Sequence, residues 1–105
     1  MKTKADNENQ QVEIDKIIHE PARLKIIAQL YVVDSADFLF LMRQTGLSQG
    51  NVSGHLSKLE DADYVKIEKG YKGKRPQTMI LLTKKGRQMF EKYIHTMREF
   101  FADFD

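Results

Sequence analysis

The apolar residues of this 105-residue chain change their period once, near Tyr64. Before that point they recur every three or four residues, as on the buried face of a helix. After it come an alternating run over 65–69 and a second β-like run over 78–82, which are typical of two strands. The sequence therefore predicts a mainly helical α+β fold with one β-hairpin, placed late in the chain.

Two helices are expected before the central part of the chain. Ile14, Ile17 and Ile18 are spaced i, i+3 and i+4, which predicts a short helix. A second helix is expected to start at Pro21, because proline lacks the N–H that the first turn of a helix leaves unpaired. The polar segment 1–11 has no such periodicity and is predicted to be a loose tail.

Capping residues place two further helices close together. Ser35 or Asp37 can cap the first of them, and Gly46 suits the left-handed conformation that often ends a helix. Ser48 can cap the second helix only two residues later. Two helices joined by a short turn that contains glycine form a helix-turn-helix, so this motif is predicted over residues 37–63.

The hairpin leads directly into a long last helix. Thr83 can cap this helix, and the segment 84–103 has no proline and one early glycine, Gly86. Between the two β runs, segment 70–76 is rich in glycine and charge, which predicts a long basic tip. We expect residues 12–83 to form the helix-turn-helix with its hairpin, and residues 84–105 to form a separate C-terminal helix.

The net charge of +2 hides a strong asymmetry along the chain. Segment 66–87 holds eight basic residues and one acid, Glu68, and so carries +7, whereas the other 83 residues carry −5. A basic block on an acidic body favours a polyanionic partner such as nucleic acid. The plain alternative is a solvated surface hairpin that binds nothing.

Composition excludes several other classes of protein. The chain has no cysteine, which excludes disulfides, thiolate catalysis and zinc sites that need thiolate. No apolar run approaches the roughly 18 residues of a membrane helix, and the N-terminus does not resemble a secretory signal. His19, His55 and His95 are scattered without convincing metal-ligand spacing. We therefore expect a cytoplasmic protein that is no enzyme and needs no metal or cofactor.

The segment Gly-Leu-Ser-Gln-Gly-Asn-Val-Ser-Gly-His-Leu-Ser-Lys-Leu-Glu, residues 46–60, resembles the recognition-helix signature of MarR/ArsR-like winged-helix transcriptional regulators. The similarity is to the small stand-alone branch with one winged helix per chain. Segment 19–24 resembles the opening helix of that branch, and segments 69–76 and 82–86 resemble its wing and the entry to its last helix. The resemblance implies a winged helix-turn-helix that binds DNA as a homodimer and controls transcription, usually by repression. Asp63 departs from it, because the family usually has glycine there, and this leaves the end of the recognition helix open by one or two residues.

An α-helix can enter the major groove and read base edges with its exposed N-terminal face. Gln49 and Asn51 suit bidentate contact with adenine, Ser53 and His55 can reach a base or a phosphate, and Lys58 suits a phosphate. The predicted DNA contacts of this helix are Ser48, Gln49, Gly50, Asn51, Ser53, Gly54, His55, Ser57 and Lys58.

Two glycines on the predicted outward face need a separate explanation. Gly50 and Gly54 each cost about 1 kcal/mol of helix stability relative to alanine. We interpret them as permitting close approach of the helix backbone to DNA. The alternative is a weak helix with a flexible start.

The hairpin would act as the wing of such a protein. Its tip could straddle the sugar-phosphate backbone or enter the minor groove, and Arg75 is the better minor-groove candidate because its planar, weakly hydrated head suits narrow grooves. Tyr71 could stack on DNA or brace the hairpin. The predicted wing contacts are Lys69, Tyr71, Lys72, Lys74 and Arg75.

The last helix carries more apolar side chains than a chain of this size can easily cover. Residues 90, 97 and 104 are seven apart, which is typical of a short coiled-coil seam. We predict a homodimer through these residues, although the helix could instead fold back on its own domain. The predicted dimer contacts are Ile14, Ile17, Ile18, Phe90, Tyr93, Ile94, Met97, Phe100, Phe101 and Phe104.

The sequence thus predicts a homodimeric, sequence-specific regulator that binds double-stranded DNA, acts as a repressor and does not associate with a membrane. Two alternatives remain open, a winged-helix adaptor that binds protein and a basic domain that binds RNA. A basic hairpin disfavours the adaptor, and the shortage of exposed aromatic side chains for base stacking disfavours the RNA-binding domain. A cleft between the dimer helix and the helix-turn-helix could hold a small-molecule effector, but core packing explains the same residues equally well.

Overall fold

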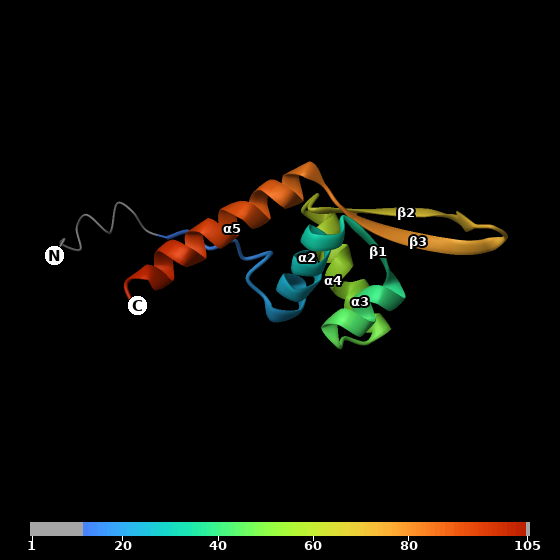
Figure 1. Cartoon of the computed structure of the whole chain (residues 1–105), viewed down its shortest axis with the longest axis horizontal. Coiled ribbons are helices and arrows are strands. Elements are labelled where there is room, and N and C mark those ends of the chain that lie inside the picture. The colour runs from blue at the N-terminus through green and yellow to red at the C-terminus, as the bar shows by residue number, and fades with distance from the viewer. Residues whose placement is uncertain (1–11, 105) are drawn as a thin grey trace.

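The computed structural model describes residues 12–104, so the predicted tail over 1–11 lies outside the described residues. Figure 1 shows helices gathered on one side of a small sheet, with the hairpin and the last helix leaving in opposite directions. The sheet is antiparallel with strand order β1-β3-β2. The elements are α2 (Pro21–Val33), β1 (Ser35–Asp37), α3 (Phe38–Thr45), α4 (Gln49–Asp61), β2 (Val65–Lys72), β3 (Arg75–Leu82) and α5 (Lys84–Ala102).

The prediction of a short helix from the three N-terminal isoleucines is wrong, because residues 16–18 form only a turn. The Asp15 carboxylate accepts hydrogen bonds from the backbone N–H groups of Ile17 (2.8 Å) and Ile18 (3.1 Å). A short polar side chain that bonds nearby N–H groups in this way competes with helix formation. Pro21 also disfavours helical backbone at the residue before it.

The capping residues act largely as predicted. Asp37 caps α3 by accepting from the N–H of Phe40 (2.8 Å), and Gly46 ends that helix with a φ of 75°. Ser35 does not serve as the cap, because residues 35–37 pair with β3 as the unpredicted strand β1. Ser48 caps α4 through the N–H of Asn51 (3.2 Å), so α3 and α4 form the predicted helix-turn-helix.

One apolar core joins all of these elements. The predicted stripe of α4, Val52, Leu56 and Leu59, is fully buried in it, which fixes the opposite side of the helix outward. Complete burial of one such side chain stabilises the fold by about 1.5–3 kcal/mol. The buried apolar residues are Ile18, Ala22, Ile26, Ile27, Leu30, Ala36, Leu41, Val52, Leu56, Leu59, Tyr64, Val65, Ile80, Phe90 and Tyr93.

The hairpin has longer strands and a shorter tip than the sequence predicted. β2 and β3 stay paired out to Lys72 and Arg75, and two residues connect them. Gly73 is the first of these and has a φ of 65°, as in a two-residue type II′ turn. β1 pairs only as far as Met79, so beyond that point β3 is an edge strand, where Pro76 is tolerated. The polar residues of segment 70–76 therefore belong mostly to strands whose two faces are solvated.

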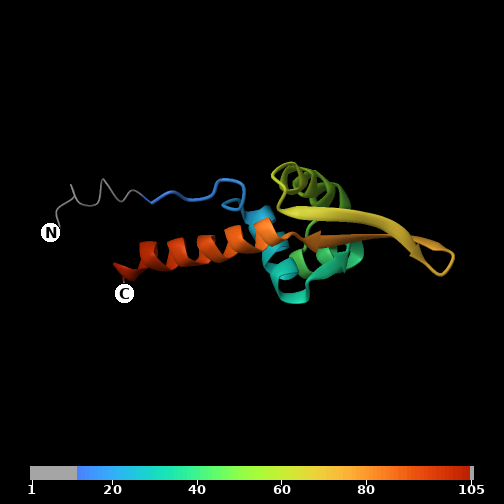
Figure 2. The same cartoon turned by 90° about the horizontal axis from the view of Figure 1, so that it is seen from above.

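Helix α5 begins as predicted at the Thr83 cap, whose Oγ1 accepts from the N–H of Gly86 (2.8 Å). A Cβ atom at Gly86 would lie 2.1 Å from the carbonyl oxygen of Tyr64, so only glycine lets the helix start this close to β2. Phe90 and Tyr93, in the first half of α5, are buried in the core. The second half extends away from the body, on the side opposite the hairpin (Figure 2).

Candidate nucleic-acid interface

The outward face of α4 is exposed along its length. Ser48 lies at its N-terminus, and its hydroxyl can still donate to a ligand while it accepts from the backbone. The other predicted contacts that are exposed are Gln49, Gly50, Asn51, Ser53, Gly54, Ser57 and Lys58. These predicted contacts are polar and carry one positive charge, that of Lys58, which suits a helix that reads base edges.

The two glycines of α4 are not required by packing inside the chain. A Cβ atom built at Gly50 or Gly54 would meet no other atom within 4 Å. Neither residue has the positive φ that would demand glycine, since the positive-φ glycines of the described chain are Gly46 and Gly73. Because neither residue has a side chain, the backbone of α4 is uncovered at these two points on its outward face. This is consistent with close approach of a ligand to the helix backbone.

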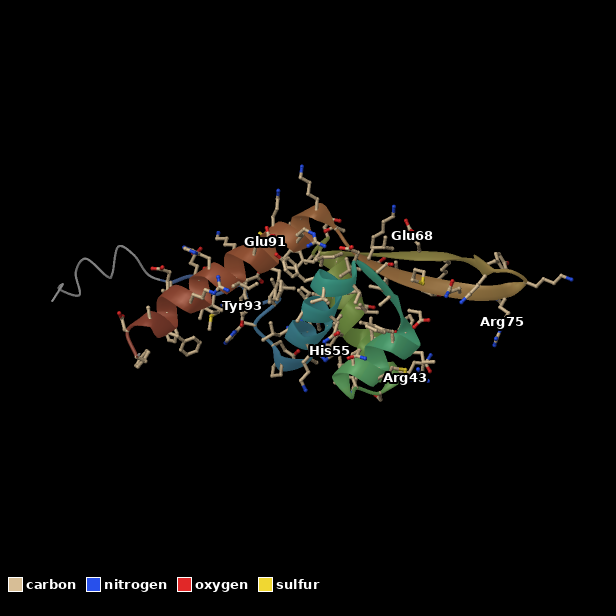
Figure 3. The ribbon with its side chains drawn as sticks, viewed as in Figure 1. Arg43, His55, Glu68, Arg75, Glu91 and Tyr93 are labelled. Atoms are coloured by element: carbon tan, nitrogen blue, oxygen red, sulfur yellow. The ribbon has the colours of Figure 1, made fainter. Side chains whose placement is uncertain are left out.

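His55 lies apart from the other predicted contacts, since its side chain is only 24% exposed and turns toward the start of α2 (Figure 3). Its Nδ1 lies 3.3 Å from Nη1 of Arg23 and 3.8 Å from Oε1 of Glu20. The ring thus packs against the first turn of α2, beside the exposed face of α4. The contact of His55 with DNA stays a prediction.

The end of α4, which the sequence left open, is a Schellman motif. The N–H of Tyr64 donates to the carbonyl oxygen of Leu59 (2.9 Å), and the N–H of Asp63 donates to that of Glu60 (2.8 Å). Asp63 has a φ of 67°, the left-handed conformation for which glycine is the usual choice. Aspartate tolerates this conformation better than most residues, so the substitution keeps the helix end in place.

The two faces of the hairpin carry different predicted contacts. Residues directly opposite each other share a face, so Lys69 and Tyr71 lie on the side of the buried Val65, together with Thr78 and Pro76. Lys72 and Arg75 are opposite each other on the other face, and Lys74 is in the turn. Figure 3 shows Arg75 close to the hairpin tip.

Tyr71 is 76% exposed, so much of its ring is available to an external ligand. Its cross-strand partner is Pro76. Stacking on DNA and bracing of the hairpin both stay predictions. The wing thus offers cations on both faces and at its tip.

A model of the winged-helix DNA-binding domain matches residues 22–101 of the chain. The chain belongs to this family. A protein of Methanocaldococcus jannaschii described as uncharacterized is 38% identical over 80 residues, which are 76% of this chain and 87% of that protein. The family model describes a DNA-binding domain and not an enzyme.

Solved structures share the fold over nearly the whole chain. A transcriptional regulator homologue from Pyrococcus horikoshii OT3 matches with a TM-score of 0.84 and 24% identity, covering 94% of this chain and 98% of that one. A putative MarR-family regulator from Enterococcus faecalis V583 matches with a TM-score of 0.69 and 21% identity, covering 98% and 93%. The winged-helix fold that the resemblance to MarR-like regulators implied is therefore confirmed.

Arg43 is a basic side chain of the helix-turn-helix that was not among the predicted DNA contacts. Arg43 is exposed in the last turn of α3, the first helix of the helix-turn-helix (Figure 3). In this motif the first helix crosses the DNA backbone while the second enters the major groove. That general rule could have identified Arg43 as a candidate phosphate contact.

The ten predicted dimer contacts separate into three groups according to their burial in the winged helix. Ile18, Phe90 and Tyr93 are buried within the chain and pack in its own core, so their part in a dimer contact stays a prediction. Phe100, Phe101 and Phe104 are exposed near the end of α5. The partly buried remainder is Ile14, Ile17, Ile94 and Met97.

A cleft of about 480 Å³ lies between α2 and α5. Its lining is mostly apolar with one cation, and comprises Leu24, Phe90, Tyr93, Ile94, Met97, Arg98 and Phe101. Within residues 12–104, three or more potential metal ligands gather nowhere. No helix of the described part combines the length and apolarity needed to cross a membrane.

Proposed function

We propose that this winged helix is a homodimeric, sequence-specific DNA-binding repressor, with α4 in the major groove and the wing on the backbone or in the minor groove. The observation that carries the proposal is the exposed polar face of α4 beside the basic hairpin. Helices of this kind read base edges, and basic arms neutralise phosphates. Repression follows the usual role of the regulators that the sequence resembles.

The homodimer is supported by the exposed end of α5. Phe100 and Phe101 meet edge to face with ring centroids 5.2 Å apart, and Phe104 lies against Phe100 at 6.2 Å. Together they form an apolar surface that a second α5 can cover. A two-fold dimer would place two copies of α4 about one DNA turn, roughly 34 Å, apart and would bind a near-palindromic site.

The cleft between α2 and α5 adjoins this dimer surface. Ile94, Met97 and Phe101 line the cleft and are also predicted dimer contacts. Core packing and dimer contacts account for these side chains as well as a small-molecule effector does, so the effector stays a prediction.

The first experiment is fluorescence anisotropy with mixed genomic duplexes across a salt series, comparing the native chain with a Lys74→Ala/Arg75→Ala variant. Loss of two phosphate contacts should flatten the slope of log K against log salt by about 2. A Lys25→Ala/Lys92→Ala variant is the matched control, since both lysines are exposed and lie outside the wing and α4. It should keep the native slope.

The outcome also separates the alternatives that the sequence left open. Duplex binding with the expected salt dependence supports the regulator. If the native chain does not bind duplex DNA at low salt, the wing does not contact DNA, and the protein-binding adaptor becomes the better hypothesis. Tighter binding to structured or single-stranded RNA than to duplex would favour the RNA-binding domain.

A further inference from the structure

The residues that precede α2, together with its first turn, make side-chain hydrogen bonds to three separate parts of the winged helix. We name this stretch, residues 15–23, the linking segment. Its first contact is with the residue that follows α4 and precedes the hairpin. The hydroxyl of Tyr64 donates to Oδ2 of Asp15 (2.5 Å), while Oδ1 of the same carboxylate orders the turn of the linking segment.

The second contact is with the middle of α4. Arg23 donates through Nε to the carbonyl oxygen of Ile17 (2.6 Å) and through Nη1 to His55 (3.3 Å). Glu20 caps α2 by accepting from the N–H of Arg23 (2.8 Å), and this hydrogen bond lowers the pKa of its carboxyl. One guanidinium thereby joins the turn of the linking segment to the helix that carries the proposed DNA contacts.

The third contact is with α5. Nδ1 of His19 and the hydroxyl of Tyr93 are 2.9 Å apart, and their rings are tilted with centroids 5.9 Å apart. Tyr93 lies just before the half of α5 that leaves the body. The linking segment therefore contacts the proposed dimer helix as well as the middle of α4 and the residue before β2.

Such contacts differ in kind from the apolar core around them. Burial of apolar surface favours compactness without specifying an angle, because it is not directional. Hydrogen bonds weaken steeply as their geometry departs from linear, so three of them from one short segment specify orientation. All three are partly buried, where competition from water is reduced.

We propose that Asp15, His19 and Arg23 are positioning residues that fix the angle between α4 and α5, and thereby the separation of half-sites that the dimer accepts. This inference rests on the proposed function, since half-site separation has meaning only for a dimer on DNA. In a two-fold dimer any rotation of α4 against α5 occurs twice, once in each copy. A small change of angle thus changes the distance between the two recognition helices.

The test removes two hydroxyl groups and leaves the aromatic rings in place, in a Tyr64→Phe/Tyr93→Phe variant. The matched control is Tyr31→Phe, which also deletes a tyrosine hydroxyl that donates to a carboxylate, that of Glu91 (2.8 Å), outside the linking segment. The chain has no cysteine, so a pair of introduced cysteines takes up the spin labels alone. Ser57→Cys on α4 and His95→Cys on α5, two exposed positions, are combined in the same chain. Dilution with unlabelled protein restricts the measurement to distances within one chain.

The expected result is one narrow α4–α5 distance distribution in the parent and in the control, and a broader or shifted one in the double variant. On duplexes that carry two selected half-sites at varied spacing, the double variant should lose about tenfold of the preference for the best spacing, the usual size of such couplings. Binding to random duplex should not change. A change in stability alone would alter neither the distance nor the spacing preference of the folded dimer.

Unchanged distances together with unchanged spacing preference would overturn the inference while the proposed function stands. If the parent selects no DNA at all, the proposed function fails and the part of the inference that concerns half-sites fails with it. The distance measurement then decides alone whether the linking segment orients α4, because it needs no DNA.

Discussion

The hairpin tip and the end of α5 leave the same packed body in opposite directions and carry opposite chemistry (Figure 1). The hairpin end is cationic, with Lys72, Lys74 and Arg75 around a two-residue turn. The end of α5 is aromatic, with exposed Phe101 and Phe104. Each arm projects beyond the core, so neither is shaped mainly by packing within its own chain.

The difference shows which force each arm can use. Salt screens the attraction between exposed charges, so that this attraction falls off over about 10 Å at 0.1 M ionic strength. Apolar contacts do not depend on charge and gain from the release of water. The hairpin is thus suited to a polyanion and the end of α5 to an apolar surface such as its own copy. Changes of salt should separate the two.

The largest effect is expected from a change to the body that both arms share. Leu56, on the buried face of α4, is 1% exposed. Leu56→Ala should therefore lower the free energy of unfolding by about 2–5 kcal/mol, because it removes buried apolar surface and leaves a cavity. Urea unfolding followed by circular dichroism measures this. Leu39→Ala is the matched control, because Leu39 is 52% exposed and should cost far less. Equal losses for the two variants would contradict the core described above.

The second effect concerns the aromatic arm alone. A Phe101→Ala/Phe104→Ala variant removes two exposed aromatic side chains from each copy, and each buried phenylalanine contributes about 1.5–3 kcal/mol. The dimer dissociation constant should therefore rise more than about a hundredfold. Sedimentation at low and high salt measures it, and the shift should be similar at both. Val32→Ala, at an equally exposed site on α2, should leave the association unchanged.

A native chain that sediments as a monomer at tens of micromolar would contradict the dimer itself. The same result would return the apolar end of α5 to the alternative of folding back on its own domain. It would leave the basic arm untouched, because the salt dependence of DNA binding does not require the aromatic side chains.

The third effect sharpens the role of the cationic arm. Arg75→Lys keeps the charge but loses the planar guanidinium, which suits narrow A·T-rich minor grooves. The salt dependence of binding should stay close to native, while the preference for A·T-rich over G·C-rich duplex falls a few-fold. Lys72→Arg, a charge-conserving change on the same face, is the control and should leave that preference at or above its native level. An unchanged A·T preference in Arg75→Lys would place Arg75 on the backbone, where a lysine can replace it.

What the sequence predicted well depends on neighbours within a few residues. The caps Asp37, Ser48 and Thr83 and the left-handed Gly46 follow from local hydrogen bonds and backbone freedom, and each was found in place. The buried stripe of α4 follows from its period alone. Local rules therefore placed the helix-turn-helix and the start of α5.

What it missed is set by partners distant in the chain. Strand β1 exists because residues 35–37 meet residues 79–81, which no local pattern indicates. The contact of His55 with Arg23, 32 residues away, could likewise not be foreseen from the place of His55 on the helix. The N-terminal isoleucines have a helical spacing, but the carboxylate of Asp15 and the contact with Tyr64 stabilise a turn instead.

The smallest effect is a pH dependence at the point where the hairpin leaves the body. Burial, and then the hydrogen bond to Asp15, raise the pKa of Tyr64 above its ordinary value. A raised pKa in the folded state means that the neutral phenol stabilises the fold at pH values below the ordinary tyrosine pKa of about 10. This contribution is lost as the pH rises above that value, because the unfolded chain then releases the proton more readily.

Tyr64→Phe should therefore be less stable than the native chain at pH 7, by about 0.5–1.5 kcal/mol for one hydrogen bond. Above about pH 10 the native chain should lose stability more steeply, so the difference between the two should shrink. Urea unfolding from pH 7 to 11 measures it, with the 76% exposed Tyr71→Phe as the control for loss of a hydroxyl. A difference that stays constant with pH would mean that the Tyr64 hydroxyl is no more protected than an exposed one. The hairpin would then be joined to the body by its apolar residues alone, without help from the Asp15 contact.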